Sequence, residues 1–217
     1  ATENLLSIGV RVLTNARPEK FYGSDYVRGV ALDDGRFFDL DFAVIGIGAD
    51  AQESLAKSAR LRVDGGIVVD QYCQTSEVDI FACGDCARVV LPDGTLTRRR
   101  EDWAHAREQA IATARNMIGE TCVYDPVAWG WSEQGDLLLQ FAGQTNDWSD
   151  ALYRKAATGI LCFKLDGDRI IAAAGANASK DMLAVRRLIE AQVSVDSRSL
   201  CDPGVKLKSL LVTGRAA

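Results

Sequence analysis

Apolar and polar residues alternate in several short stretches of this chain, which is the pattern of half-buried β-strands. Residues 9–13 and 26–32 alternate in this way, and Asp33-Asp34-Gly35 is typical of a turn after such a strand. Residues 42–45 and 80–83 are instead continuously apolar, and this pattern predicts two buried strands. A further strand is expected over residues 67–70, after Gly65-Gly66.

Two longer stretches have the spacing of amphipathic helices. From Glu101 to Gly119, apolar or small residues recur every three or four positions, and residues 180–191 carry a second stripe. Ser179 directly precedes the second helix and is expected to cap it. A short helix is expected over residues 52–59. The two stripes consist of Trp103, Ala106, Ala110, Ala114 and Met117, and of Met182, Leu183, Val185, Leu188 and Ile189.

Beyond Tyr124-Asp125-Pro126 the chain changes to a series of short alternating segments. Asp166-Gly167-Asp168 has the composition of a hairpin turn between two of them. The predicted strands cover residues 137–142, 151–154, 160–165 and 170–174. Because one helix follows these strands, the last part of the chain predicts a small antiparallel sheet with a helix packed on it.

Composition and charge are those of an ordinary globular protein. The 217 residues are 47% hydrophobic and 25% charged, which suits one large domain or two small ones. The net charge of -5, with no basic run beyond residues 98–100, argues against nucleic-acid binding. No apolar run reaches the roughly 18 to 20 residues of a membrane span, and no secretion signal is recognised at the start. We therefore expect a cytoplasmic protein whose partners are small molecules or proteins.

Asp85 is the strongest candidate for a binding residue. It follows the apolar stretch 80–83 and Gly84, so a carboxylate is expected where a buried strand ends. Such a carboxylate is placed to accept hydrogen bonds from the sugar hydroxyls of a cofactor. The alternative is a turn aspartate that binds its own backbone. A second apolar stretch closes on Gly46 and Gly48, where a backbone can approach a ligand.

Cys83 and Cys86 form a CxxC pattern, which occurs in thiol redox pairs and in zinc sites. A zinc site needs further ligands, yet His105 is the single histidine and no second CxxC exists. A redox pair usually opens a helix, whereas Cys83 is expected to end a strand. We therefore expect reduced thiols, no metal and no catalytic histidine. Trp129 and Trp131 are either core residues or walls of a planar cofactor.

Seven stretches, taken together, resemble one family of proteins. These are the FAD-dependent, NADH-oxidising reductases that supply electrons to ferredoxins of oxygenase systems. They belong to the pyridine nucleotide-disulfide oxidoreductase superfamily but lack the redox disulfide of glutathione reductase. In the family's order, the stretches are VIGIG (44–48), GIVVD (66–70), TS (75–76), IFACGDCA (80–87), REDW (100–103) continuing to Gln109, WGWSEQ (129–134) and DP (202–203).

The resemblance implies an α/β plus α+β fold: a partial FAD/NAD-binding, Rossmann-like three-layer segment, then a small C-terminal antiparallel sheet with a helix. The implied domains are residues 1–46 (closing strands of the NAD-binding domain), 47–125 (second segment of the FAD-binding domain) and 126–217 (C-terminal reductase domain). Both GxGxxG phosphate loops of such reductases are missing from the sequence. The resemblance therefore implies the C-terminal portion of a longer enzyme.

The resemblance also implies a cofactor site, with no catalytic and no metal-binding residue. Asp85 would hold the FAD ribitol, the start of the helix near Trp103 would present backbone N–H groups to the flavin, and Trp131 would lie beside it. Electrons would pass from NADH through FAD to an iron-sulfur ferredoxin. The implied cofactor-binding residues are Gly46 and Gly48, with Glu101 near the nicotinamide, and Gly84, Asp85, Trp103, Ala104 and Trp131.

Two consequences follow from the missing phosphate loops. The sequence alone is expected to bind FAD weakly or not at all, and to be inactive as an oxidoreductase. The alternative is a non-catalytic module that docks a redox partner or self-associates, with a homodimer as one such assembly. One departure from the family lies inside the implied site, because His105 stands where the family often has asparagine.

Overall fold

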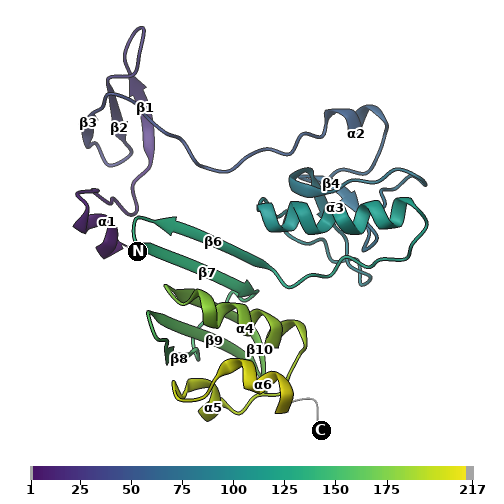
Figure 1. Cartoon of the computed structure of the whole chain (residues 1–217). Coiled ribbons are helices and arrows are strands. Elements are labelled where there is room, and N and C mark those ends of the chain that lie inside the picture. The colour runs from purple at the N-terminus through teal and green to yellow at the C-terminus, as the bar shows by residue number, and fades with distance from the viewer. Residues whose placement is uncertain (1, 214–217) are drawn as a thin grey trace. The chain divides into compact units, whose positions relative to one another are not determined.

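The computed structural model describes residues 2–213, in two compact units that comprise residues 1–49 and 50–217 (Figure 1). The first unit contains helix α1 and a three-stranded antiparallel sheet of order β1-β2-β3. Its central strand β2 supplies the buried side chains Val30 and Leu32. The element bounds are α1 Thr2–Ser7, β1 Pro18–Tyr22, β2 Gly29–Leu32 and β3 Phe37–Asp39.

Two predicted strands of the first unit are wrong. Residues 9–13 form no strand and follow helix α1, which the sequence did not reveal. Residues 42–45 are also outside any strand, and their side chains are exposed, as is the 91% exposed Ile47. An apolar run forms a buried strand only beside a strand that pairs with it, and β1–β3 leave this segment unpaired. The predicted turn at residues 33–35 is confirmed between β2 and β3.

The second unit begins with a small parallel pair of strands and a long helix. Strands β4 (Ile67–Val69) and β5 (Ala87–Val89) pair in parallel, with Ile67 opposite Ala87. The short helix predicted over 52–59 is confirmed as α2 (Ser54–Ser58), and β4 confirms the strand predicted over 67–70. The strand predicted over 80–83 is wrong, because this stretch makes only an isolated bridge between Gln74 and Phe81. The strand that pairs with β4 is β5, which begins after the turn at Gly84, whereas residues 80–83 lie before this turn.

Helix α3 (Trp103–Met117) confirms the helix predicted to end at Gly119, but its buried face is not the predicted stripe. Trp103 is 68% exposed and Met117 is 64% exposed. The buried residues of the helix are Ala104, His105, Gln109, Ala112 and Thr113. The buried face is therefore small and polar, which allows the chain around Gly84 to approach the helix closely.

Five antiparallel strands form the sheet of the C-terminal part, in the order β6-β7-β10-β9-β8 (Figure 1). The four predicted strands and the hairpin turn at residues 166–168 are confirmed. The edge strand β6 was not predicted, because Gly130 and the polar residues 132–134 interrupt its apolar pattern. The bounds are β6 Trp129–Gln134, β7 Leu137–Gly143, β8 Leu152–Lys155, β9 Ile160–Asp166 and β10 Arg169–Ala176.

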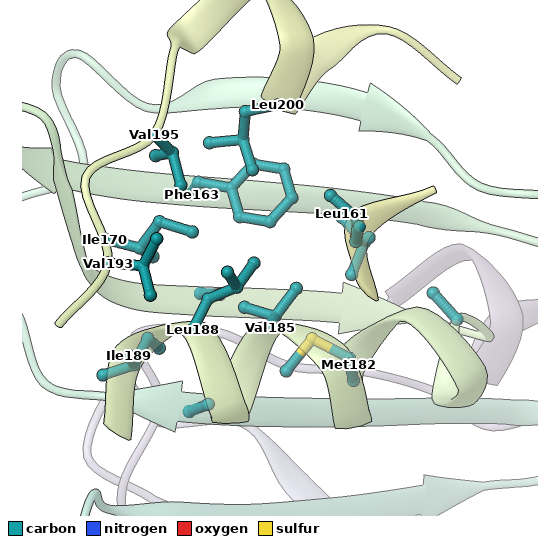
Figure 2. Close-up of a cluster of buried hydrophobic side chains, with 14 of the residues drawn as sticks. Leu161, Phe163, Ile170, Met182, Val185, Leu188, Ile189, Val193, Val195 and Leu200 are labelled. Atoms are coloured by element: carbon teal, nitrogen blue, oxygen red, sulfur yellow. The ribbon is translucent and has the colours of Figure 1, made fainter. Parts of the chain in front are cut away.

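Helix α4 (Ser179–Glu190) packs on this sheet, and α5 (Ser197–Cys201) and α6 (Leu207–Thr213) complete the part of the chain that is described. Figure 2 shows Leu161 and Phe163 of β9 with Val185 and Leu188 of α4 in one buried cluster. The fold class expected for this part, a small antiparallel sheet with a helix, is confirmed.

Two details of helix α4 differ from the prediction. The N-cap residue is Ala178, so Ser179 is already helical and makes no side-chain cap. Leu183 is exposed, whereas the other four residues of the predicted stripe are buried. None of the helices in residues 2–213 has the length and apolar character that crossing a membrane requires.

Candidate functional site

The turn at Gly84 and Asp85 is the part of the chain where the predicted binding residues converge. Residues Gly84–Cys86 form a single 3₁₀ turn, η1, between Cys83 and β5. Gly84 has φ +76°, a left-handed conformation that favours glycine. Its buried N–H donates to Oε1 of Gln109 on α3 at 2.7 Å. Asp85 is thus in a turn held on a helix, and not at the end of a strand as predicted.

The Asp85 side chain is exposed to solvent. Its carboxylate makes no hydrogen bond or ion pair with the residues that the structure describes. Its backbone carbonyl accepts a hydrogen bond from Nη1 of Arg99 at 2.7 Å, and Nη2 of the same guanidinium lies 2.6 Å from Oε1 of Glu101. Arg99 therefore joins the turn to the residues that lead into α3, and it leaves the carboxylate of Asp85 available to a ligand.

The start of helix α3 lies beside this turn. Asp102 is its N-cap, and Oδ1 of Asp102 accepts the backbone N–H of His105 at 2.7 Å. Arg100 donates to the other oxygen of the Asp102 carboxylate at 2.9 Å. The first turn of a helix presents backbone N–H groups and partial positive charge, which favours an electron-rich ligand. Trp103 and Ala104 are the first two residues of this turn.

His105 is buried beside the turn. Its Nδ1 lies 2.6 Å from the hydroxyl oxygen of Tyr124. Its Nε2 makes no hydrogen bond of standard geometry within residues 2–213. Burial lowers the pKa of His105, and the positive charge of Arg100 adds to this effect, whereas Asp102 and Asp85 oppose it. The imidazole is therefore neutral at pH 7.

We expect the stability of the second unit to fall below pH 6.5 because of His105. The folded pKa lies below the ordinary value of 6.5, so between these values the unfolded chain binds more protons. The free energy of unfolding is therefore fully present above pH 6.5 and decreases as the pH falls toward the folded pKa. The slope contributed by this single histidine is at most about 1.4 kcal/mol per pH unit.

Urea unfolding at pH 7.5 and pH 5.5 measures this slope for the unchanged chain and for His105→Asn. The asparagine variant should lose less stability between the two pH values, since the side chain at position 105 no longer titrates. Equal losses in both proteins would show that the stability does not depend on the protonation of His105.

The CxxC cysteines are free thiols and lie on the same turn. Cys83 precedes η1 in an extended conformation, and the Cys86 thiol lies 3.5 Å from the Cys83 carbonyl oxygen. The premise that Cys83 ends a strand is therefore wrong. Burial raises the pKa of Cys86, and it also raises the pKa of Cys73, so neither thiol is activated toward thiolate. Among residues 2–213, no three His, Cys, Asp or Glu side chains are grouped to hold a metal ion.

The structure brings together five of the eight predicted cofactor-binding residues, all around η1 and the start of α3. Of the other three, Gly46 and Gly48 belong to the first unit, and Trp131 lies on β6, where it is 48% exposed. The five residues are Gly84, Asp85, Glu101, Trp103 and Ala104. Their assignment to a cofactor stays a prediction.

Sequence reasoning missed three residues that shape this site, namely Gln109, Arg99 and Tyr124. A polar side chain four residues after His105, on the same side of a helix, was the available signal for Gln109.

Strand β6 is also connected to α3, through Arg186 of α4. This side chain lies over the Trp129 ring at 5.7 Å and forms an ion pair with Glu108 at 2.9 Å.

Two family profiles match the sequence. The profile described as "Pyridine nucleotide-disulphide oxidoreductase" matches residues 1–110, and the profile described as "Reductase C-terminal" matches residues 129–211. The first match covers 110 of the 217 residues, which is just over half of the chain. The Rossmann-like assignment of the earlier part of the chain is therefore confirmed together with the fold class.

Solved structures of reductases have the same fold. The crystal structure of the covalent putidaredoxin reductase–putidaredoxin complex matches at 28% identity and a TM-score of 0.88, over 100% of this chain and 53% of that one. The ferredoxin reductase for the CYP199A2 system from Rhodopseudomonas palustris matches at 29% identity and a TM-score of 0.87, over 96% and 52%. The chain thus spans about half the length of these structures. By the profile match over half of its residues, the chain belongs to the pyridine nucleotide-disulphide oxidoreductase family.

Proposed function

We propose that this sequence acts as the C-terminal portion of a flavoprotein reductase. The whole enzyme would pass electrons from NADH through FAD to an iron-sulfur ferredoxin of an oxygenase system. The observation that carries this proposal is the uncommitted Asp85 carboxylate on a turn held against the start of α3. The likeness over 100% of the chain to a reductase solved in complex with putidaredoxin supports the choice of electron acceptor.

The residues present fit the ribityl and flavin parts of FAD. Asp85 offers two oxygens that can accept hydrogen bonds from ribitol hydroxyls, and its side chain is exposed to receive them. The first turn of α3, at Trp103 and Ala104, offers backbone N–H groups beside it. When bound, FAD would accept a hydride and release single electrons. The residues of this chain would bind and orient it.

Each of the three segments of the sequence has a proposed role in binding the cofactors. Residues 47–125 would hold the FAD, and Gly46, the last residue of segment 1–46, would lie near the nicotinamide together with Gly48 and Glu101 of the second segment. Residues 126–217 would place Trp131 at the flavin. The exposed Trp131 on the edge strand β6 is compatible with this role, because an exposed aromatic side chain is free to stack. Both phosphate-binding loops would come from the sequence that relatives carry outside the matched region.

Reconstruction of a whole reductase tests the proposal. This chain would be joined to the part of putidaredoxin reductase that it does not cover, and the purified chimera would be examined for flavin absorbance and for NADH-dependent reduction of putidaredoxin. We expect a yellow, active chimera, while the chain alone loses added FAD on desalting. A folded chimera without flavin, or a yellow and active chain alone, would contradict the proposal.

A non-catalytic docking or self-association module is the second candidate. The apolar side chains of residues 42–47 favour it, because exposed apolar groups of this kind drive association. Sedimentation of the chain at several concentrations distinguishes the two. Concentration-dependent dimers that form without flavin would support the module.

A further inference from the structure

Gln109 is buried where an amide side chain is costly. It is fully shielded from solvent in the middle of α3, and removing such a group from water costs free energy unless its polar atoms are hydrogen-bonded. Its Oε1 accepts the N–H of Gly84 at 2.7 Å, whereas its Nε2 makes no hydrogen bond of standard geometry with any residue in 2–213. A leucine would fill this position in an ordinary amphipathic helix.

The Gly84 N–H explains why an acceptor is needed at this position. Gly84 is buried and left-handed, so its amide turns toward α3 and away from water. A Cβ atom built on Gly84 would lie 3.6 Å from the Cβ of Ala106, so the turn already touches the helix surface. Without the Gln109 oxygen, this N–H would be buried and unpaired, and a buried donor without an acceptor is unfavourable. The turn would then be driven to reorient toward another acceptor.

Gln109 is the middle member of a row of buried polar residues on α3. His105 lies one helical turn before Gln109, and Thr113 one turn after it, with the Thr113 hydroxyl donating to the Gln109 backbone carbonyl at 2.8 Å. All three are buried. A helix packed on a core usually places apolar side chains at its buried positions, but α3 has polar side chains there at three consecutive turns. Such departures are concentrated at functional sites.

We propose that Gln109 is a positioning residue for the cofactor. By accepting the Gly84 N–H, it holds the Gly84–Asp85 turn so that the Asp85 carboxylate faces the ribitol at the start of α3. This inference rests on the proposed function, because it assigns Asp85 to FAD. Gln109 itself touches no ligand, since it is buried beneath the turn.

The test compares two substitutions that differ in one acceptor oxygen. Gln109→Met has a similar size but cannot accept the Gly84 N–H, whereas Gln109→Glu keeps a carboxyl oxygen in that place. Two quantities are measured by NMR in the ¹⁵N-labelled chain: the hydrogen-exchange rate of the Gly84 amide, and the shifts of the Asp85 and Trp103 amides on titration with FAD. Gln140→Met, a buried glutamine on β7, is the matched control.

We expect Gln109→Met to speed Gly84 exchange about tenfold and to raise the FAD concentration for half-maximal shift about tenfold, with Gln109→Glu close to the unchanged chain in both. Gln140→Met should change neither quantity. If Gln109→Met does not fold, Gln109→Asn, whose shorter amide does not reach Gly84, takes its place.

Three outcomes would overturn the inference. They are unaltered Gly84 exchange without the acceptor, faster exchange with an unaltered FAD response, or a failure of Gln109→Glu to restore the FAD response. The failure of the proposed function gives a different result: in that case FAD shifts neither Asp85 nor Trp103 in the unchanged chain. The exchange rate of Gly84 reports on the hydrogen bond in either case.

Discussion

Replacement of Phe163 by alanine is expected to lower the free energy of unfolding of the C-terminal sheet by about 3–5 kcal/mol. The ring is fully buried and packs between β9 and the helices, as Figure 2 shows beside Leu200 and Leu161. Truncation removes its apolar surface from the core and leaves a cavity that the antiparallel strands β10 and β8 on either side cannot close. Urea unfolding followed by tryptophan fluorescence measures the loss.

Phe141→Ala is the matched control for this substitution. Phe141 lies on β7 of the same sheet but is 45% exposed, so its loss should cost about 1 kcal/mol or less. A cost for Phe163→Ala no larger than that for Phe141→Ala would show that the cluster in Figure 2 is not the core that stabilises this sheet.

Replacement of Arg154 by methionine is expected to cost about 2–4 kcal/mol, although this arginine has no acidic partner among the described residues. Its guanidinium is buried and donates to backbone carbonyl oxygens in the last turn of α5 and in the loop after it. The distances are 3.1 Å to Leu200, 2.6 Å to Asp202 and 2.6 Å to Val205. One side chain thus holds the loop between α5 and α6 against β8. Methionine would fill the space but leave these carbonyl groups without a donor.

Two further variants make the Arg154 prediction specific. Arg187→Met removes an exposed arginine of α4 and should change the free energy of unfolding by less than about 0.5 kcal/mol. Arg154→Lys should recover only part of the loss, because a single ammonium group cannot reproduce the planar fork that reaches Asp202 and Val205 together. Thermal unfolding of the three variants at pH 7 gives the ranking. Full recovery by lysine would contradict the role of the fork.

The C-terminal sheet was predictable because its strands carry their own signals. Residues 160–165 and 170–174 are short and largely apolar, and the Asp-Gly-Asp turn between them joins them as a hairpin, so that each strand has its partner nearby in the sequence. The apolar runs 42–45 and 80–83 failed for a physical reason. A run of apolar residues reports a preference for burial, but the partner that buries it is set by tertiary structure. Residues 42–45 have no such partner in their unit, and the chain pairs with β4 only after it has turned at Gly84.

The exposed residues of the candidate site were predictable from the sequence, but the buried Gln109 beneath them was not. Asp85 and the start of α3 are visible in the sequence, because an acidic turn residue and an N-cap signal are local features. Gln109 was not assigned a role, because in a periodicity of apolar residues a glutamine counts as an interruption. Its proposed role depends on the approach of Gly84, 25 residues earlier, and this proximity is a property of the fold.

Titration of the ¹⁵N-labelled chain with FAD tests the central claim most directly, since NMR detects binding that is too weak to survive desalting. The claim predicts that amide shifts concentrate at Gly84, Asp85, Trp103 and Ala104. These shifts should disappear in Asp85→Ala and remain in Asp136→Ala, which removes the same charge from the exposed β6–β7 turn. Shifts that are absent from these four residues, or that persist in Asp85→Ala, would contradict the claim that this turn is the flavin site.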